Sequence, residues 1–316
     1  MRQLNGCLRL TAAGQVFSAQ SQPPLKPAIP HRLGDRLFAT LLRWISSARP
    51  RVAADNVRMK TLIDHARRVC TALVGVAAVM VTMANPLGPA AASPVQTKVH
   101  AFDGHRVTLD VYPAVGPLRG AAIVSHGFTR SRRTLAGLAQ ALADAGLLVL
   151  TPDLPCTFDF RCNARALTAM VGSLRAGGTF GAPVKGVMLV GFSAGGLSSL
   201  LAADAPGVVG FVGLDPFDRT MSGEAERLGL SAAGRLRTEA LLLRAPPSSC
   251  NAQAVAASWA TALPALWRDE LITGASHCDF ESPTDWMCRL ACGDTDPARQ
   301  ERVRQELLDA AARWMR

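Results

Sequence analysis

The sequence predicts an α/β protein whose central sheet is mostly parallel and covered by helices on both faces. Short apolar runs, each long enough for one strand, alternate with longer segments whose apolar residues recur at helical spacing. This alternation is typical of parallel sheets, because a helix must carry the chain back before the next parallel strand begins. No internal repeat or linker interrupts the pattern after residue 93, so residues 93–316 are predicted to form one domain.

The domain is expected to begin with a β-hairpin. Residues 97–102 and 106–112 alternate apolar and polar side chains around Asp103 and Gly104, a pair typical of hairpin turns. Such a hairpin commonly forms an antiparallel edge on an otherwise parallel sheet. The further predicted strands are residues 121–124, 147–150, 186–190, 208–214, 239–243 and 265–272, and the predicted helices are residues 134–145, 164–174, 196–203, 252–261 and 297–314.

The pattern Gly-x-Ser-x-Gly follows the predicted strand over residues 186–190, near the middle of the domain. Its members are Gly191, Ser193 and Gly195. This spacing is typical of a nucleophile elbow, a sharp strand-to-helix turn that holds the serine in a strained conformation above the sheet. The same five residues could form an ordinary turn rich in glycine and serine, so the interpretation depends on the rest of the chain.

A serine hydroxyl becomes a good nucleophile only when a base takes its proton and an acid orients that base. Asp215 and His277 each follow a predicted strand, and loops after parallel strands gather at one edge of the sheet. Alone, Asp215 before Pro216 could open a turn, and His277 beside Cys278 could be a packed side chain. Together with Ser193 they predict a catalytic triad.

Two other aspartates compete with Asp215 as the acid. Asp218 lies three residues further into the same loop, and Asp279 follows closely after His277. Asp215 is preferred because it stands directly at the end of its strand, where the backbone is best fixed.

Acyl transfer also needs backbone N–H groups that point at the developing oxyanion. Ala194, the residue after the nucleophile, is one expected donor. The second is Phe128, in the loop Ser125-His126-Gly127-Phe128 that follows the first parallel strand. His126 is expected to brace this loop and not to act as the base.

These stretches resemble the α/β-hydrolases, over about residues 107–316, and within them the chlorophyllase and platelet-activating-factor acetylhydrolase group of serine esterases. The resemblance is carried by His126-Gly127-Phe128, Gly191-Phe192-Ser193-Ala194-Gly195-Gly196, Gly213-Leu214-Asp215-Pro216 and His277-Cys278-Asp279-Phe280. It implies the α/β-hydrolase fold, with Ser193 as nucleophile, Asp215 as acid and His277 as base. We therefore predict cleavage of carboxylic esters through an acyl-enzyme, with no metal or cofactor.

Two departures from that group bear on the reaction. Many relatives have His before the serine, where this chain has Phe192, and dienelactone hydrolases would have Cys at position 193. Dienelactone hydrolysis is therefore disfavoured. Lipid or polyester hydrolysis is an alternative, because Phe128, Phe192 and Phe217 are all expected near the site. A non-catalytic binding protein of the same fold is a second alternative, although such proteins typically lack a triad member.

The basic charge of the chain belongs to its first part. The formal net charge is +10, yet residues 93–316 carry 22 basic side chains against 21 acidic ones. That region has no basic patch interleaved with aromatic residues, the pattern typical of nucleic-acid binding. No nucleic-acid partner is expected.

Residues 59–92 have the features of a secretory signal peptide. Basic residues precede an apolar run of 16 residues over 69–84, and the small residues Ala90-Ala91-Ala92 follow. A membrane span usually needs about 20 residues, so a cleaved signal is favoured over a retained anchor and the protein is predicted to be periplasmic or secreted. Residues 1–58 are interpreted as a disordered extension or as a wrongly assigned start ahead of Met59.

An even number of cysteines lies after this predicted cleavage site, which favours three disulfides in an oxidising compartment. They are Cys156, Cys162, Cys250, Cys278, Cys288 and Cys292. Cys156 and Cys162 are the most local pair. At least one long-range link is expected from Cys278, Cys288 or Cys292, with Cys250 as the favoured partner; a Cys288–Cys292 pair would stabilise least. Zinc is disfavoured, because no Cys-x-x-Cys pair exists.

Overall fold

The computed structural model describes residues 94–220 and 226–316. The predicted extension over residues 1–58 and the predicted signal peptide over residues 59–92 both lie outside the described residues. Within the described part, no helix has the length and apolar character required to cross a membrane.

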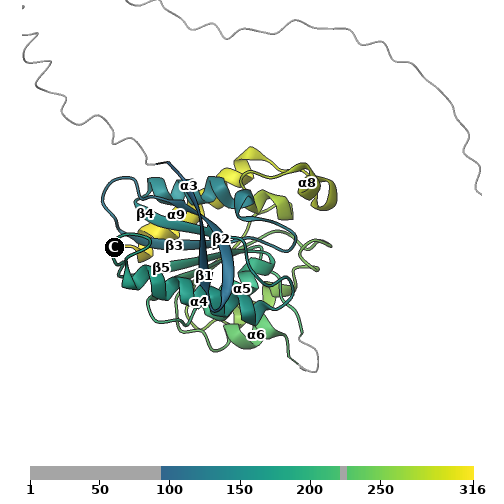
Figure 1. Cartoon of the computed structure of the whole chain (residues 1–316). Coiled ribbons are helices and arrows are strands. Elements are labelled where there is room, and N and C mark those ends of the chain that lie inside the picture. Colours follow the sequence, from purple (N-terminus) through teal and green to yellow (C-terminus); the bar gives the residue numbers. More distant parts are fainter. Residues whose placement is uncertain (1–93, 221–225) are drawn as a thin grey trace, which may run out of the picture. The chain divides into compact units, whose positions relative to one another are not determined.

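A mixed sheet of eight strands forms the centre of the described domain, in the order β1-β2-β4-β3-β5-β6-β7-β8 (Figure 1). The strands are β1 (Gln96–Phe102), β2 (His105–Tyr112), β3 (Gly120–Ser125), β4 (Leu147–Pro152), β5 (Val187–Phe192), β6 (Val208–Leu214), β7 (Ala240–Arg244) and β8 (Leu266–Leu271). β2 pairs antiparallel with β1 and with β4, and all other neighbours are parallel. The predicted hairpin edge and the mostly parallel sheet are both confirmed.

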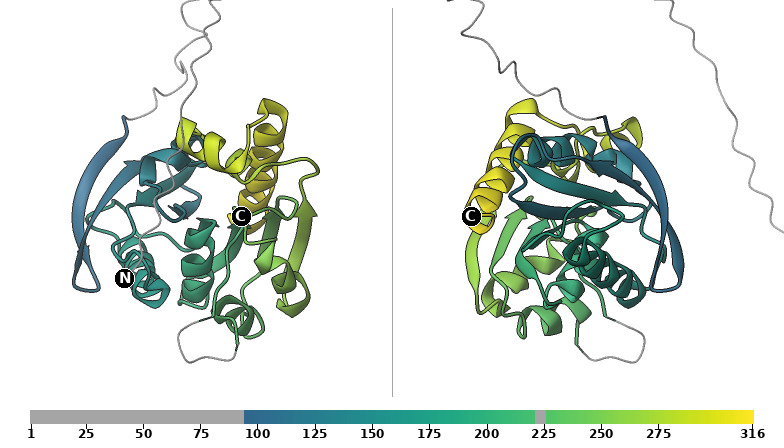
Figure 2. Two further views of the ribbon diagram at one scale, coloured as in Figure 1. Left: turned by 90° about the vertical axis from the view of Figure 1, so that its right-hand side faces the viewer. Right: turned by 60° about the vertical axis from the view of Figure 1, so that its left-hand side comes forward.

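Helices cover both faces of this sheet, as predicted. The α-helices are α3 (Ala136–Asp144), α4 (Phe160–Ala176), α5 (Ala194–Ala202), α6 (Leu228–Ala233), α7 (Trp259–Ala262), α8 (Trp286–Cys292) and α9 (Pro297–Trp314), and the 3-10 helices are η1 (Arg132–Leu135), η2 (Val255–Ser258) and η3 (His277–Phe280). Figure 2 shows the yellow helix α9 on one side of the sheet and the teal helices α4 and α5 on the other.

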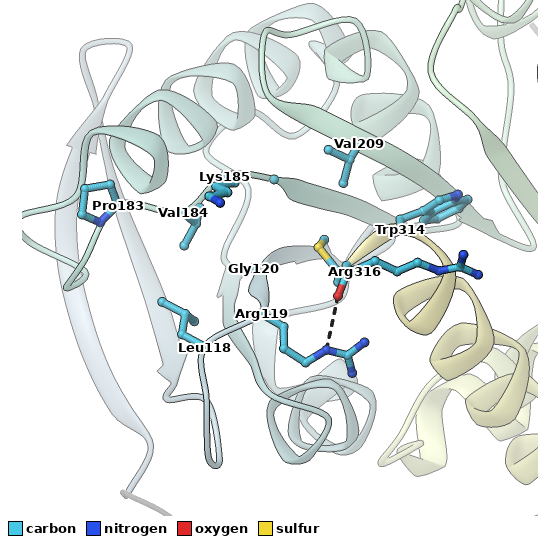
Figure 3. Close-up of a pocket in the computed structure, with 11 residues that line it drawn as sticks. Leu118, Arg119, Gly120, Pro183, Val184, Lys185, Val209, Trp314 and Arg316 are labelled. Carbon is cyan, nitrogen blue, oxygen red and sulfur yellow. Dashed lines mark hydrogen bonds between the residues drawn. The ribbon is translucent and has the colours of Figure 1, made fainter.

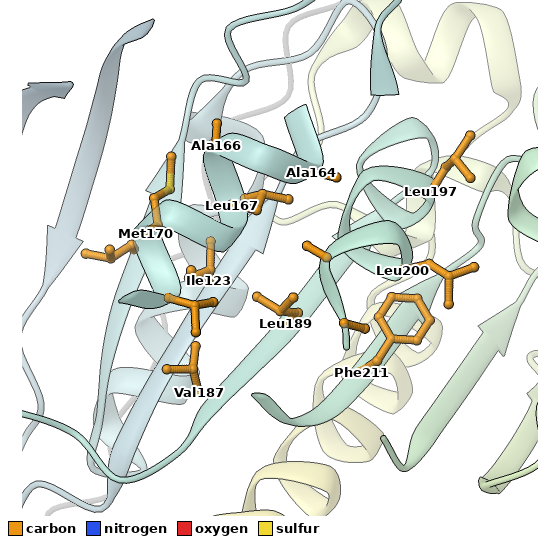
Figure 4. Close-up of a cluster of buried hydrophobic side chains, with 14 of the residues drawn as sticks. Ile123, Ala164, Ala166, Leu167, Met170, Val187, Leu189, Leu197, Leu200 and Phe211 are labelled. Atoms are coloured by element: carbon orange, nitrogen blue, oxygen red, sulfur yellow. The ribbon is translucent and has the colours of Figure 1, made fainter. Parts of the chain in front are cut away.

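The two faces of each central strand supply separate hydrophobic clusters. Leu189 of β5 packs with Leu167 of α4 and Leu200 of α5 (Figure 4), whereas the next residue, Val190, belongs to the cluster that α3 and α9 cover, together with Leu307. Because neighbouring side chains point to opposite faces, a strand covered on both sides must be apolar throughout. This is why uninterrupted apolar runs located the strands correctly.

The predicted helix over residues 252–261 is wrong in its first half. Ala252, Gln253 and Ala254 have φ angles of 50, 59 and 54°, and the chain becomes helical only from Val255. The side-chain oxygen of Asn251 accepts hydrogen bonds from the N–H groups of Ser248 and Ala254, both at 2.8 Å, and so stabilises a turn where a helix was expected. Helices α6 and α8 were not predicted.

Three disulfides join the six cysteines of the described region. Cys156 pairs with Cys162, the most local pair, and Cys250 pairs with Cys292 across 42 residues, which confirms the predicted long-range link. The third disulfide joins Cys278, the residue after His277, to Cys288 in α8. Helix α8 is therefore bonded covalently both to the loop after β7 and to the loop that holds His277.

We expect the double variant Cys250→Ser/Cys292→Ser to lose about 4 kcal/mol of unfolding free energy, because the unfolded chain then regains the freedom of a 42-residue loop. The variant Cys156→Ser/Cys162→Ser should lose only about 2 kcal/mol, because its loop spans six residues. Urea unfolding without reductant measures both. Equal losses in the two variants would contradict a loop-closure origin.

Candidate active site

Ser193 stands at the sharp turn between β5 and α5. Its φ and ψ angles are 51° and −120°, a strained conformation that non-glycine residues seldom adopt. A Cβ atom on Gly191 would lie 2.3 Å from the carbonyl oxygen of Gly195, and one on Gly195 would lie 2.3 Å from the carbonyl oxygen of His126. The turn therefore needs glycine at both positions, which is the geometry that the Gly-x-Ser-x-Gly pattern predicts.

Asp215 and His277 come together from two different strand ends. Asp215 directly follows β6, and its Oδ2 lies 2.6 Å from Nδ1 of His277, the first residue of η3. Both side chains are buried. Because Asp215 accepts the Nδ1 proton, Nε2 is the ring nitrogen that can accept a proton, and His277 lines the same cavity as Ser193. The ring of Phe192 packs against the imidazole, with centroids 4.6 Å apart.

The two competing aspartates have other partners. Asp218 accepts hydrogen bonds from the N–H groups of Gly229 and Leu230, at the start of α6, and from the indole of Trp259. Asp279 accepts from the N–H group of Ser276 and from the guanidinium of Arg299. Of these three carboxylates, only Asp215 bonds to His277.

The loop after β3 lies against the elbow, as expected for an oxyanion site. A Cβ atom on Gly127 would come within 3.0 Å of Cβ of Ser193, so glycine allows this close approach. Phe128 and Ala194 line one shared cavity. Ala194 is the first residue of α5, where N–H groups have no acceptor within the helix and the helix dipole favours negative charge.

His126 braces this loop, as predicted. Its Nε2 accepts the N–H group of Leu154 at 3.0 Å, so Nδ1 carries the proton and donates to the carbonyl of Gly127 at 2.7 Å. That carbonyl shares a peptide unit with the N–H group of Phe128, so His126 also fixes the direction of the expected oxyanion donor. Burial lowers the pKa of His126 and favours the neutral ring that these bonds require.

The lowered pKa of His126 predicts a loss of stability in acid. The unfolded chain binds a proton below the ordinary histidine value of about 6.5, and the folded chain resists it. The stabilisation is therefore complete above about pH 6.5 and declines as the pH falls towards the folded pKa. We expect His126→Asn to show a smaller difference in unfolding free energy between pH 7.5 and pH 5 than the unaltered protein. An equal difference in both proteins would contradict this role.

An ion pair that the sequence did not reveal joins the loop after β3 to the loop that holds His277. Nε of Arg130 lies 2.7 Å from Glu281, four residues after His277, and the guanidinium also contacts Asp285 at 3.0 Å. Burial raises the pKa of the Glu281 carboxyl, and Arg130 acts in the opposite direction. Arg130 and Glu281 are 151 residues apart, so no local pattern could have paired them.

Two small cavities meet at this site. One, of about 180 Å³, is lined by Phe128, Ala194 and Leu154, and the other, of about 230 Å³, by Ser193, His277 and residues of α8. The loop from Gly127 to Arg130 borders both. The candidate site thus has two lobes, one on each side of this loop.

A larger cavity of about 580 Å³ lies at the opposite ends of the strands (Figure 3). Its lining includes Leu118, which precedes β3, Gly120, the first residue of β3, and Trp314 of α9. Nε of Arg119 donates to the carbonyl of Met315 at 3.2 Å. None of the predicted site residues lines it. Side-chain chemistry, and not cavity size, therefore identifies the candidate site.

Two groups of metal-ligand side chains are compact enough to be considered as ion sites in the described region. They are His105 with Cys156 and Cys162, and Cys278 with Cys288 and Cys292. Every cysteine in both groups is disulfide-bonded and so offers no thiolate to a metal.

A mostly parallel eight-stranded sheet with a serine at a strand-to-helix elbow defines the α/β-hydrolase class of proteins. Residues 122–316 match the alpha/beta hydrolase family, and the chain belongs to it. The matched region contains every predicted site residue, from Phe128 to His277.

Solved structures share this fold. A dienelactone hydrolase from Anabaena variabilis is 20% identical and superposes with a TM-score of 0.55, over 71% of this chain and 99% of its own. The esterase domain of a Rhodothermus marinus protein is 18% identical, with a TM-score of 0.53, over 71% of this chain and 100% of its own. The α/β-hydrolase GrgF from Penicillium sp. sh18 is 15% identical, with a TM-score of 0.56, over 71% of this chain and 99% of its own. At these identities the likeness shows the fold alone. No curated protein matches the sequence significantly.

Proposed function

We propose that this chain is a serine hydrolase that cleaves carboxylic esters through an acyl-enzyme. The observation that carries the proposal is the 2.6 Å hydrogen bond between His277 and Asp215, in the cavity that Ser193 also lines. The retained Gly-x-Ser-x-Gly elbow and the sequence resemblance to the chlorophyllase and platelet-activating-factor acetylhydrolase group support it.

In the first half of the proposed reaction, Nε2 of His277 takes the hydroxyl proton as Oγ of Ser193 attacks the ester carbonyl. The carbonyl oxygen becomes an oxyanion and accepts hydrogen bonds from the N–H groups of Phe128 and Ala194. His277 then gives its Nε2 proton to the departing alkoxide, so an alcohol leaves and Ser193 stays acylated. Asp215 stays ionised and stabilises the imidazolium while it exists.

In the second half, water replaces the alcohol. His277 takes a proton from the water, which attacks the acyl carbon, and the proton returns to Oγ of Ser193 as the acid leaves. The leaving oxygen must lie near His277, so the lobe that His277 lines takes the alcohol part and the lobe beyond Phe128 takes the acyl part.

Stopped-flow kinetics with p-nitrophenyl acetate test this proposal. We expect a burst of p-nitrophenol stoichiometric with the enzyme, followed by slower steady turnover, because the acyl-enzyme forms faster than it is hydrolysed. Complete absence of p-nitrophenol release would overturn the proposal and favour the alternative of a non-catalytic binding protein. A binding protein would not need the hydrogen bond between Asp215 and His277, nor a cavity that both Ser193 and His277 line.

A second candidate is lipid or polyester hydrolysis by the same mechanism, and exposed apolar side chains around the cleft favour it. Phe128 packs on Phe158 with ring centroids 5.0 Å apart, and Trp286, Met287 and Leu290 project from α8. These five side chains are between 44 and 80% exposed. Single exposed apolar residues are ordinary, but a group of them beside a site is typical of an interaction surface.

Rates on emulsified tributyrin and on a soluble p-nitrophenyl ester separate the two candidates. If these exposed side chains bind an apolar surface, Leu290→Ser lowers the rate of tributyrin hydrolysis and leaves the rate on the soluble ester unchanged. Leu118→Ser, at the opposite ends of the strands and 43% exposed, is the matched control and should change neither rate. Equal emulsion rates for Leu290→Ser and the unaltered protein would contradict a role of these exposed side chains in binding an apolar surface, and no emulsion hydrolysis by the unaltered protein would overturn this second candidate.

We propose a periplasmic or secreted location. Three disulfides support it, because such bonds persist in oxidising compartments. Mass mapping of non-reduced peptides from exported protein tests this location, and six alkylatable thiols would overturn it.

A further inference from the structure

We infer that Asn251 is a positioning residue for the triad acid, an inference that rests on the proposed function. Asn251 lies in the loop after β7, directly before the residues that were expected to be helical, and its side chain is completely buried. Its Nδ2 lies 3.3 Å from Oδ1 and 3.2 Å from Oδ2 of Asp215. It therefore contacts both oxygens of the carboxylate that binds His277.

The surrounding bonds determine which end of the amide faces Asp215. The side-chain oxygen of Asn251 accepts the N–H groups of Ser248 and Ala254, both at 2.8 Å, and Nδ2 also donates to the carbonyl of Pro246 at 3.0 Å. A flipped amide would place an NH₂ group against two N–H donors and an oxygen against a carboxylate. Only the observed orientation satisfies all of these partners.

The loop holds Asn251 in place by two further means. Ala252, Gln253 and Ala254 have left-handed backbone angles, and such strained residues persist only where their surroundings over-determine them. The neighbouring residue, Cys250, is bonded to Cys292 at the end of α8. The amide is thus supported from the loop after β7 and from α8 together.

These hydrogen bonds fix the plane of the Asp215 carboxylate group. Oδ1 accepts the N–H group of Ala245 at 2.9 Å, Oδ2 accepts Nδ1 of His277 at 2.6 Å, and the Asn251 amide bridges the two oxygens. The charged or titratable groups that act on Asp215 are His277 from η3 and Arg244 from the end of β7. Arg244 is engaged with Asp269 of β8 at 2.6 Å, so Asn251 is the neutral side chain that donates to the carboxylate and orients it.

The substitution Asn251→Asp tests this role, because it keeps the shape and replaces the donor with a second carboxylate. Loss of the bridge tilts Asp215, so we expect kcat/KM for p-nitrophenyl acetate to fall by about 10²-fold, mostly in kcat. The added negative charge favours the imidazolium, so the acidic limb of the pH profile moves to higher pH by about one unit. The titration of the His277 ring, followed by NMR, should move in the same direction.

Asn163→Asp is the matched control. Asn163 is also buried, and its amide closes the loop at Cys156 through both of its polar atoms without touching Asp215 or His277. We expect that variant to lose stability while the His277 titration stays in place. If Asn251→Asp does not fold, Asn251→Ala replaces it in the same experiment. We then expect the His277 titration to move in the same direction by a smaller amount.

The results separate two kinds of failure. An unmoved His277 titration in a folded Asn251 variant, or a shift that Asn163→Asp matches, overturns the role of Asn251. Because NMR needs no turnover, that result is independent of the proposed reaction. Complete absence of p-nitrophenol release by the unaltered protein overturns the reaction itself.

Discussion

Replacing Ser193 with alanine is expected to lower kcat/KM for a short-chain p-nitrophenyl ester by about 10⁶-fold. The variant keeps the backbone, the oxyanion donors and the cavities but has no hydroxyl to form the acyl-enzyme. Alanine has the same steric limits as serine at the observed φ of 51°, so the thermal midpoint should be unchanged.

Ser199→Ala is the control for this experiment. Ser199 lies in α5, the helix that follows Ser193, is completely buried, and donates weakly to the carbonyl of Val190 at 3.5 Å. Its replacement should leave kcat/KM within a few fold of the original value. Comparable activity in the Ser193 and Ser199 variants would show that another group is the nucleophile.

Replacing Asp215 with asparagine is expected to lower kcat by about 10⁴-fold, because an amide at this position can donate to Nδ1 and favours the wrong tautomer of His277. The protein should remain folded, since the substitution conserves shape. Steady-state kinetics and the thermal midpoint measure the two effects separately.

Asp218→Asn gives the opposite pattern in the same measurements. Asp218 accepts bonds from Gly229, Leu230 and Trp259, so an amide there meets N–H donors and should cost about 1–3 kcal/mol of unfolding free energy. The activity of the folded fraction should change little. A folded Asp218 variant that is as inactive as the Asp215 variant would contradict the choice of acid.

The sequence predicts the sheet well because the burial of the sheet is visible in composition. Runs such as Val187–Phe192 are apolar throughout, which only a strand covered on both faces requires. The segment after residue 251 misleads for a different reason. Its alanines favour a helix, whereas a single side chain, that of Asn251, satisfies the N–H groups of a turn instead.

The same contrast applies to the site. Ser193, Asp215 and His277 each follow a strand, so chain order and topology suffice to bring them to one edge. The contacts that hold them are different in kind. Arg130 and Glu281 are 151 residues apart in the sequence, and Asn251 and Asp215 are 36 apart. No periodic pattern in the sequence predicts either contact. Such contacts follow from tertiary packing and become visible only in the structure.

Mapping the adduct of a fluorophosphonate tests the central claim most directly. Such reagents phosphonylate a serine only when a neighbouring base and oxyanion donors activate it. We predict one adduct per chain, located by peptide mass spectrometry on Ser193, and none on Ser193→Ala. Absence of an adduct from the folded protein, or one placed on another residue, would contradict the assignment of Ser193 as the activated nucleophile.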